Sequence, residues 1–205
     1  MFIISGKRNV PRIPPKKVAV LTHSYGKCFS DVEGMTFKYG EGPNDAYIIN
    51  NFSVPGAQTS TIRNTEAFKN LIAFKPKVTF ILLGGNDITH EKVNDPTVDL
   101  PKTIAANLEN LSAQIEREAG SKVRIVGLES RVKPRDLEAE QYNKVKNRTN
   151  RILKEYWAYT RVRYIPMCMS KEDLASDGVH LSKEGAVKLT TYIQKNIAHV
   201  LKHDN

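Results

Sequence analysis

Three polar residues near the two ends of the chain are of the types used in nucleophilic catalysis. Ser24 follows the apolar segment Lys17–Thr22, and Asp177 stands three residues before His180. A serine hydroxyl can attack a carbonyl when a neutral imidazole takes its proton and an acid on the other ring nitrogen sets the tautomer. Each feature alone has a simpler interpretation, because serine is common in turns and Asp and His also occur in loops that lead into helices.

Two glycine-containing turns could supply the hydrogen-bond donors that such an attack needs. Gly56 follows the apolar segment 47–54, and Gly84-Gly85-Asn86-Asp87 follows the segment 77–83. A tetrahedral oxyanion is stabilised by donors placed in advance, such as an open backbone N–H at Gly56 or the amide of Asn86. Taken singly, both segments are equally well explained as ordinary turns.

Five short segments rich in β-branched and apolar residues predict the strands that position these groups. They are 17–22, 47–54, 77–83, 122–127 and 161–166. Since helical patterns lie between them, we expect an α/β fold with a largely parallel sheet covered on both faces. Ligands in such sheets bind beyond the carboxyl ends of the strands, and Ser24, Gly56 and Asn86 follow three of those ends. The segment 177–180 precedes the last helix, so we expect His180 to return to this edge beside Ser24.

Three amphipathic patterns predict the longer helices. The first carries a stripe of apolar residues that stops near Gly120: Leu100, Ile104, Leu108, Leu111 and Ile115. The second has an apolar side (Tyr142, Val145, Thr149, Ile152, Tyr156) and an opposite basic side (Lys144, Arg148, Arg151, Lys154). The third follows Ser182, a residue suited to an N-cap, and its apolar side comprises Ala186, Leu189, Ile193, Ile197 and Val200.

The four polar segments, in this order and spacing, resemble the sequence blocks of the SGNH (GDSL-like) hydrolases from residue 17 to about residue 201. This resemblance implies a three-layer α/β/α fold with a five-stranded parallel, flavodoxin-like sheet, and a serine esterase that needs no cofactor. It implies that Ser24 is the nucleophile, His180 the general base and Asp177 its partner. The oxyanion hole would comprise Ser24 through its backbone N–H, Gly56 and Asn86.

The first block departs from the family pattern, since Thr22-His23-Ser24 stands where Gly-Asp-Ser is usual. We expect His23 to be a turn residue whose ring faces solvent or packs on its loop; the alternative is that it tunes the oxyanion loop or contacts substrate. Tyr25 and Asp87 are further candidates for contacting substrate or shaping these loops. No spacing typical of a zinc site links the histidines, so no metal is expected.

Charge and composition indicate which partners and which cellular compartment are expected. The net charge is +9, residues 1–17 contribute five lysines and arginines with no acid, and the segment 131–163 carries a local charge of +6. Basic surface attracts polyanions, so nucleic acid or an anionic membrane surface is a candidate partner, with simple solubility as the alternative. No apolar stretch approaches the roughly 18–20 residues of a membrane span. With two cysteines, a reducing, cytoplasmic compartment is expected, and secretion after signal removal stays open.

Residues 1–16, with three prolines among basic residues, are expected to form an arm or linker before a hydrolase-like domain over 17–205. The basic arm and the His-Ser variant are also similar to esterase domains in the first open-reading-frame proteins of LINE-type retrotransposons. The competing hypothesis is a non-catalytic module of the same fold that binds nucleic acid or anionic lipid. A nucleotide-binding flavodoxin-like protein is disfavoured, because no glycine-rich phosphate loop follows the first strand.

Overall fold

The chain alternates strands and helices along most of its length in the computed structural model, which describes residues 13–42, 44–158 and 164–203. The strands are β1 (Lys16–Thr22), β2 (Thr36–Lys38), β3 (Ala46–Ser53), β4 (Val78–Leu82), β5 (Lys122–Val126) and β6 (Tyr164–Ile165). The α-helices are α1 (Glu66–Phe74), α2 (His90–Val93), α3 (Leu100–Ala119), α4 (Ala139–Trp157) and α5 (Lys183–His203). Short 3₁₀ helices are η1 (Ser24–Val32), η2 (Ile62–Asn64), η3 (Gly85–Asp87) and η4 (Lys171–Asp173).

The sheet has the strand order β2-β3-β1-β4-β5-β6. The β3-β1-β4-β5-β6 portion is parallel throughout, as expected, and β2 adds an antiparallel edge strand beside β3. The sheet therefore has six strands, one more than the five predicted. The pattern missed β2 because its three residues, two of them exposed, are too few to show alternation. Of the predicted strand 161–166, only Tyr164–Ile165 is assigned, and residues 161–163 lie outside the described part.

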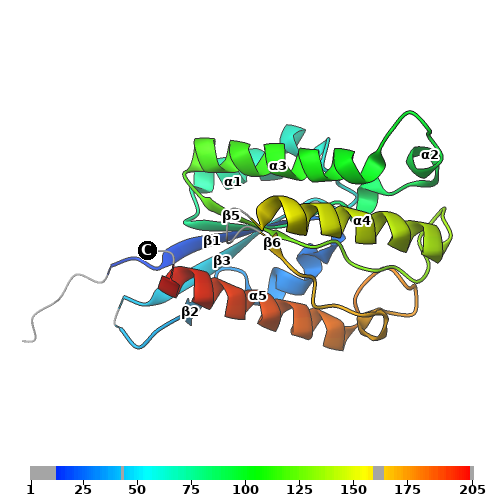
Figure 1. Cartoon of the computed structure of the whole chain (residues 1–205). Coiled ribbons are helices and arrows are strands. Elements are labelled where there is room, and N and C mark those ends of the chain that lie inside the picture. The colour runs from blue at the N-terminus through cyan, green and yellow to red at the C-terminus, as the bar shows by residue number, and fades with distance from the viewer. Residues whose placement is uncertain (1–12, 43, 159–163, 204–205) are drawn as a thin grey trace, which may run out of the picture.

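Helices cover both faces of the sheet and make a three-layer fold (Figure 1). Helices α1, α3 and α4 lie on one face, and α5 with η1 lies on the other. The alternation along β1 explains this arrangement, because Ala19 and Leu21 enter the first core while Val18 and Val20 enter the second. Burial on both faces is what makes the parallel strands continuous apolar runs in the sequence.

The predicted helix ends agree with local capping chemistry. Helix α3 ends at Gly120, whose φ of 65° is a left-handed conformation that favours glycine. Ser182 caps α5, since its Oγ accepts a hydrogen bond from the N–H of Gly185 at 3.0 Å. In α4 the expected apolar side is only partly correct: Tyr142 is fully buried, but Tyr156 is 54% exposed. Across the described residues, no helix combines the length and hydropathy that crossing a membrane requires.

Candidate active site

Ser24 lies at the carboxyl end of β1, where the strand gives way to η1. It lines a pocket of about 440 Å³ together with His180 and residues from the start of α5. The remaining lining residues are Tyr25, Lys27, Cys28, Pro55, Leu181, Ser182, Lys183 and Ala186. Two residues far apart in the sequence, Ser24 and His180, are therefore brought to one pocket at the predicted edge of the sheet.

Asp177 and His180 form a short, locally built pair. Asp177 Oδ2 lies 2.7 Å from His180 Nδ1, and its Oδ1 accepts backbone N–H bonds from Val179 and His180, each at 2.9 Å. The hydrogen bond from His180, followed by the backbone bonds, lowers the pKa of Asp177. An ionised Asp177 favours a proton on His180 Nδ1, which leaves Nε2 as the lone-pair nitrogen that a general base requires.

The hydroxyl of Ser24 has a different partner from the one expected. Its Oγ lies 3.1 Å from Nδ1 of His23, and no hydrogen bond joins it to His180 in the part of the chain that the structure describes. Proton transfer to His180 therefore requires the Ser24 side chain to turn away from His23 toward the pocket.

The predicted oxyanion donors stand at the ends of the two strands that flank β1. In η3, which follows β4, Asn86 donates through Nδ2 to the carbonyl of Ala57 at 3.2 Å, which leaves its second N–H free of that bond. Its Oδ1 accepts a hydrogen bond from Arg131 at 3.0 Å, and this contact fixes which amide atom is the donor. Gly56, in the exposed turn after β3, has φ of 76°, a conformation that glycine adopts without strain.

Tyr25 and Asp87 hold the loops around the pocket. Tyr25 is 2% exposed and its hydroxyl donates to the carbonyl of Val179, so η1 is tied to the loop that carries His180. Asp87 is equally buried and accepts the N–H and the hydroxyl of Thr59, which ties η3 to the turn after β3. Burial raises the pKa of Asp87. These contacts favour loop shaping over substrate contact for both residues.

His23 does not face solvent, because its ring is only 1% exposed; it packs instead against Tyr25 of its own loop, with ring centroids 4.9 Å apart, and faces the interior. Its Nε2 lies 3.6 Å from Oε1 of Glu129, and Arg131 donates to the same oxygen at 3.2 Å. The guanidinium of Arg131 also lies over the ring of Tyr142, 5.0 Å from its centroid. Arg131, counted with the basic surface in the sequence, is in fact buried beneath the site.

The pair Glu129 and Arg131 was missed although its signal was available. Both residues come within five positions of the end of β5, at the same edge of the sheet as Ser24 and Asn86. Charged residues directly after a buried strand are candidates for the site on the same ground as the polar residues after β1 and β4, since all these strand ends meet at one edge.

Burial and charge set the protonation of this group. Burial lowers the pKa of His23, and this effect exceeds the opposing attraction of Glu129. Burial alone would raise the pKa of Glu129, but the charges beside it lower it overall. The lowered pKa of His23 favours a neutral ring, so the group is a neutral imidazole beside a carboxylate that accepts a hydrogen bond from the Arg131 guanidinium at 3.2 Å.

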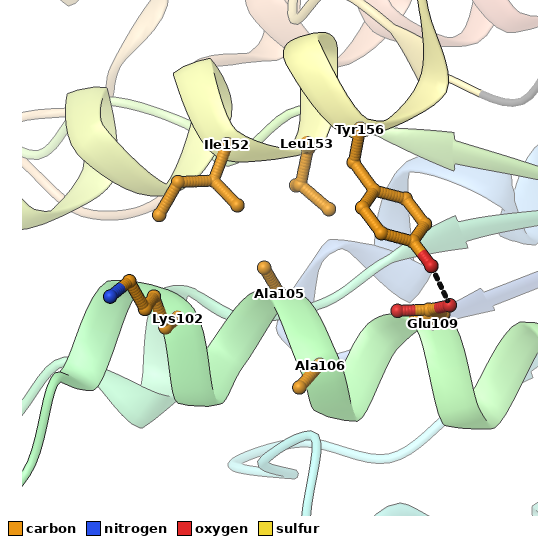
Figure 2. Close-up of a pocket in the computed structure, with 7 residues that line it drawn as sticks. All are labelled: Lys102, Ala105, Ala106, Glu109, Ile152, Leu153 and Tyr156. Carbon is orange, nitrogen blue, oxygen red and sulfur yellow. Dashed lines mark hydrogen bonds between the residues drawn. The ribbon is translucent and has the colours of Figure 1, made fainter. Parts of the chain in front are cut away.

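A second pocket, of about 180 Å³, lies between α3 and α4 and contains none of the predicted site residues. Figure 2 shows Tyr156 of α4 reaching across it to hydrogen bond with Glu109 of α3. Among the described residues, no group of three histidine, cysteine or acidic side chains is arranged to hold a metal ion.

Comparison with known proteins shows solved structures of similar fold. Similar solved structures include a putative acylhydrolase from Bacteroides fragilis, with 15% identity over 94% of this chain and 92% of that one and a TM-score of 0.65. A carbohydrate acetylesterase from Sinorhizobium meliloti has 17% identity over 90% and 99% of the two chains, with a TM-score of 0.63. A catalytic mutant of an acetylxylan esterase from Geobacillus stearothermophilus has 16% identity over 90% and 95%, with a TM-score of 0.59.

At these identities the likeness to solved structures establishes the fold, and the family comes from the sequence. No curated protein matches the chain significantly. The sequence profile of the GDSL-like lipase/acylhydrolase family matches residues 21–188, a span that contains Ser24, Gly56, Asn86, Asp177 and His180. The chain belongs to the GDSL-like lipase/acylhydrolase family.

Proposed function

We propose that this protein is a serine esterase that cleaves carboxylic esters through an acyl-enzyme on Ser24. The observation that carries the proposal is that Ser24 and His180 line one pocket and that His180 is paired with Asp177. Asn86 supports it, because its amide follows the strand next to β1. Membership of an acylhydrolase family supports ester hydrolysis in general.

In the acylation step, Ser24 Oγ bonds to the ester carbonyl carbon while its proton passes to Nε2 of His180. The carbonyl oxygen becomes an oxyanion, which accepts hydrogen bonds from the Ser24 N–H, the Gly56 N–H and the Asn86 amide. The carbon–oxygen bond to the leaving group then breaks, and His180 returns the proton to the departing alcohol. In deacylation, a water molecule gives a proton to His180 and its oxygen bonds to the acyl carbon. The bond from that carbon to Ser24 Oγ then breaks, Oγ takes the proton back from His180, and the acid is released.

The test is hydrolysis of 4-nitrophenyl acetate, a short ester suited to a chain whose structural neighbours include acetyl esterases. Ser24→Ala is expected to lose nearly all activity and to retain the wild-type circular dichroism spectrum. Ser30→Ala is the matched control, because Ser30 is an exposed serine of the same 3₁₀ helix. If wild type hydrolyses the ester no faster than Ser24→Ala, the fold serves here as a non-catalytic module.

We also propose that the basic side of α4 binds single-stranded nucleic acid. Lys144, Arg148, Arg151 and Lys154 are all exposed on this helix. Part of this charge is already paired, since Arg148 contacts Asp99 at 2.8 Å and Arg151 lies 4.0 Å from Glu155. The basic residues of the expected arm up to Arg12 lie outside the described residues.

Binding through phosphate contacts should weaken steeply with salt and show little sequence preference. Retention on single-stranded nucleic acid between low and physiological salt measures this, and Lys144→Glu/Lys154→Glu should reduce it. Retention on anionic vesicles but not on nucleic acid would assign the charge to a membrane surface, and retention on neither would make it a solubility feature. The narrower resemblance to retrotransposon esterase domains stays a prediction.

A further inference from the structure

Two histidines approach Ser24 from different sides. His180 lines the pocket beside it, whereas His23 contacts its hydroxyl from the buried side and is not among the residues that line the pocket. In the structure the hydrogen bond of Ser24 Oγ is made to His23, at 3.1 Å. The tautomer of His23 decides the direction of this hydrogen bond: Ser24 donates its proton when Nδ1 carries the lone pair.

The group behind His23 selects the tautomer that can accept this proton. His23 Nε2 is buried without a hydrogen-bond partner, and the nearest charge is the Glu129 carboxylate, with Oε1 at 3.6 Å. A carboxylate at this position attracts an N–H and repels a lone pair, so it favours the proton on Nε2. The lone pair then lies on Nδ1, which faces the Ser24 hydroxyl. Serine, imidazole and acid thus follow one another here as they do in a catalytic triad.

Arg131 stabilises the buried carboxylate of Glu129. A lone buried carboxylate is costly, but Arg131 donates to Glu129 Oε1 at 3.2 Å. The same guanidinium nitrogen donates to Asn86 Oδ1 at 3.0 Å. One buried chain of polar contacts therefore runs from the nucleophile, through His23, Glu129 and Arg131, to the amide predicted to stabilise the oxyanion.

We propose that His23, backed by Glu129, is a second proton acceptor for Ser24 and suffices for the acylation half of the reaction. The proposal rests on the proposed function and adds a catalytic residue that contacts the reacting oxygen. Attack by Ser24 Oγ on the ester carbon would pass its proton to His23 Nδ1, while the carbonyl electron pair moves to oxygen. Collapse of the oxyanion then expels the leaving group.

Burial limits what His23 can do next. Its ring is 1% exposed, so it cannot hand the proton to an alcohol or activate a water molecule in the pocket. A nitrophenolate leaves as an anion and needs no proton, whereas an alkoxide needs one. The two histidines therefore have different roles: either accepts the Ser24 proton, but only His180 donates a proton to the leaving alcohol and accepts one from the hydrolytic water.

The test removes the pocket histidine and looks for a trapped intermediate. With 4-nitrophenyl acetate, His180→Ala is expected to release about one equivalent of nitrophenolate and then stall, with one acetyl group on Ser24 by mass spectrometry. With ethyl acetate, the same variant should form no acyl-enzyme. In His23→Phe/His180→Ala, acylation should be slower by about 10²–10⁴-fold, the usual contribution of a general base.

The controls separate a chemical role from a structural one. His90→Ala/His180→Ala loses an exposed histidine instead and should acylate as fast as His180→Ala. His23→Phe keeps a ring beside Tyr25, whose centroid lies 4.9 Å away, and His23→Asn provides a second variant if the first unfolds. Circular dichroism and thermal melting check the fold of each variant.

Two outcomes would overturn the proposal: acylation of His180→Ala no faster than that of Ser24→Ala, or acylation unaffected by removal of His23. Labelling by a fluorophosphonate measures the same nucleophilic step without a carboxylic ester, because Ser24 Oγ attacks phosphorus and displaces fluoride. A wild type that takes the label but hydrolyses no ester would refute the proposed function, while the labelling rates of His180→Ala and the double variant still decide the role of His23.

Discussion

Replacing Asn86 tests the proposed oxyanion hole, because its side chain has two separable roles. Its Oδ1 accepts from Arg131 at 3.0 Å, and its Nδ2 donates to the carbonyl of Ala57 at 3.2 Å. The second N–H of Nδ2 is the one proposed to stabilise the oxyanion. Loss of one such donor costs about 10²–10³ in kcat, or about 2.7–4 kcal/mol, with little change in KM because the charge develops only in the transition state.

The structural cost of Asn86→Ala should be smaller. Two hydrogen bonds are lost, each with a net contribution of about 0.5–1.5 kcal/mol, so the free energy of unfolding should fall by about 1–3 kcal/mol. Arg131 keeps its contact with Glu129, so no unpaired charge is left in the interior. The variant should therefore stay folded at 25 °C while its kcat is severely reduced.

Asn86→Asp separates the two roles of the side chain. An aspartate keeps an oxygen for Arg131 but replaces the donor with a negative charge that repels the oxyanion, so kcat should fall at least as far as in Asn86→Ala. Asn196→Ala is the matched control, because Asn196 also donates to a backbone carbonyl, that of Tyr192 at 2.9 Å, but lies on α5. Steady-state hydrolysis of 4-nitrophenyl acetate and urea unfolding give both quantities. Wild-type kcat in either Asn86 variant would show that this residue only shapes the turn.

Three further predictions concern the buried group and the pocket. A Cβ at Gly85 would collide with the Glu129 carboxylate, so Gly85→Ala should lower the unfolding free energy by about 1–3 kcal/mol, and an unchanged urea midpoint would contradict this. Burial lowers the pKa of His23 below its ordinary 6.5, so between these two pKa values the unfolded chain binds a proton at this residue that the folded chain does not bind. The free energy of unfolding should therefore fall as the pH drops below 6.5, by up to about 1.4 kcal/mol per pH unit, and it should fall less steeply in His23→Phe. Equal slopes for wild type and His23→Phe would refute this. Lys27 and Lys183 line the pocket, where their positive charges attract an anionic substrate. Lys27→Gln should therefore raise KM about fivefold for an anionic 4-nitrophenyl ester but not for neutral 4-nitrophenyl acetate. Equal effects on both substrates would contradict this.

The layers of the fold could be predicted from the sequence because their signals are local. Buried parallel strands are continuous apolar runs, as in β4, and α3 shows its stripe directly. The additional strand β2 could not be predicted, since three residues hold no periodicity and its pairing with β3 is decided by the fold.

Part of the site is equally local. Asp177 and His180 are three residues apart in one loop, so their contact depends little on the rest of the molecule. The strand-end rule predicted the place of Ser24, and the position of His180 just before the last helix predicted its return to the same edge; both residues line one pocket.

Tertiary structure alone decided which charged residues face inward. The positions of His23, Glu129 and Arg131 just after strands place them near one edge of the sheet, but nothing in the sequence says that their side chains turn inward. Arg131 even lies in a basic stretch that otherwise predicts exposure. A charged side chain can be buried only where a partner of opposite charge is buried with it, and here the Glu129 carboxylate pairs with the Arg131 guanidinium beside the neutral imidazole that follows β1. Such pairing depends on side chains from separate strands arriving at one place, so it exists only once the sheet has formed.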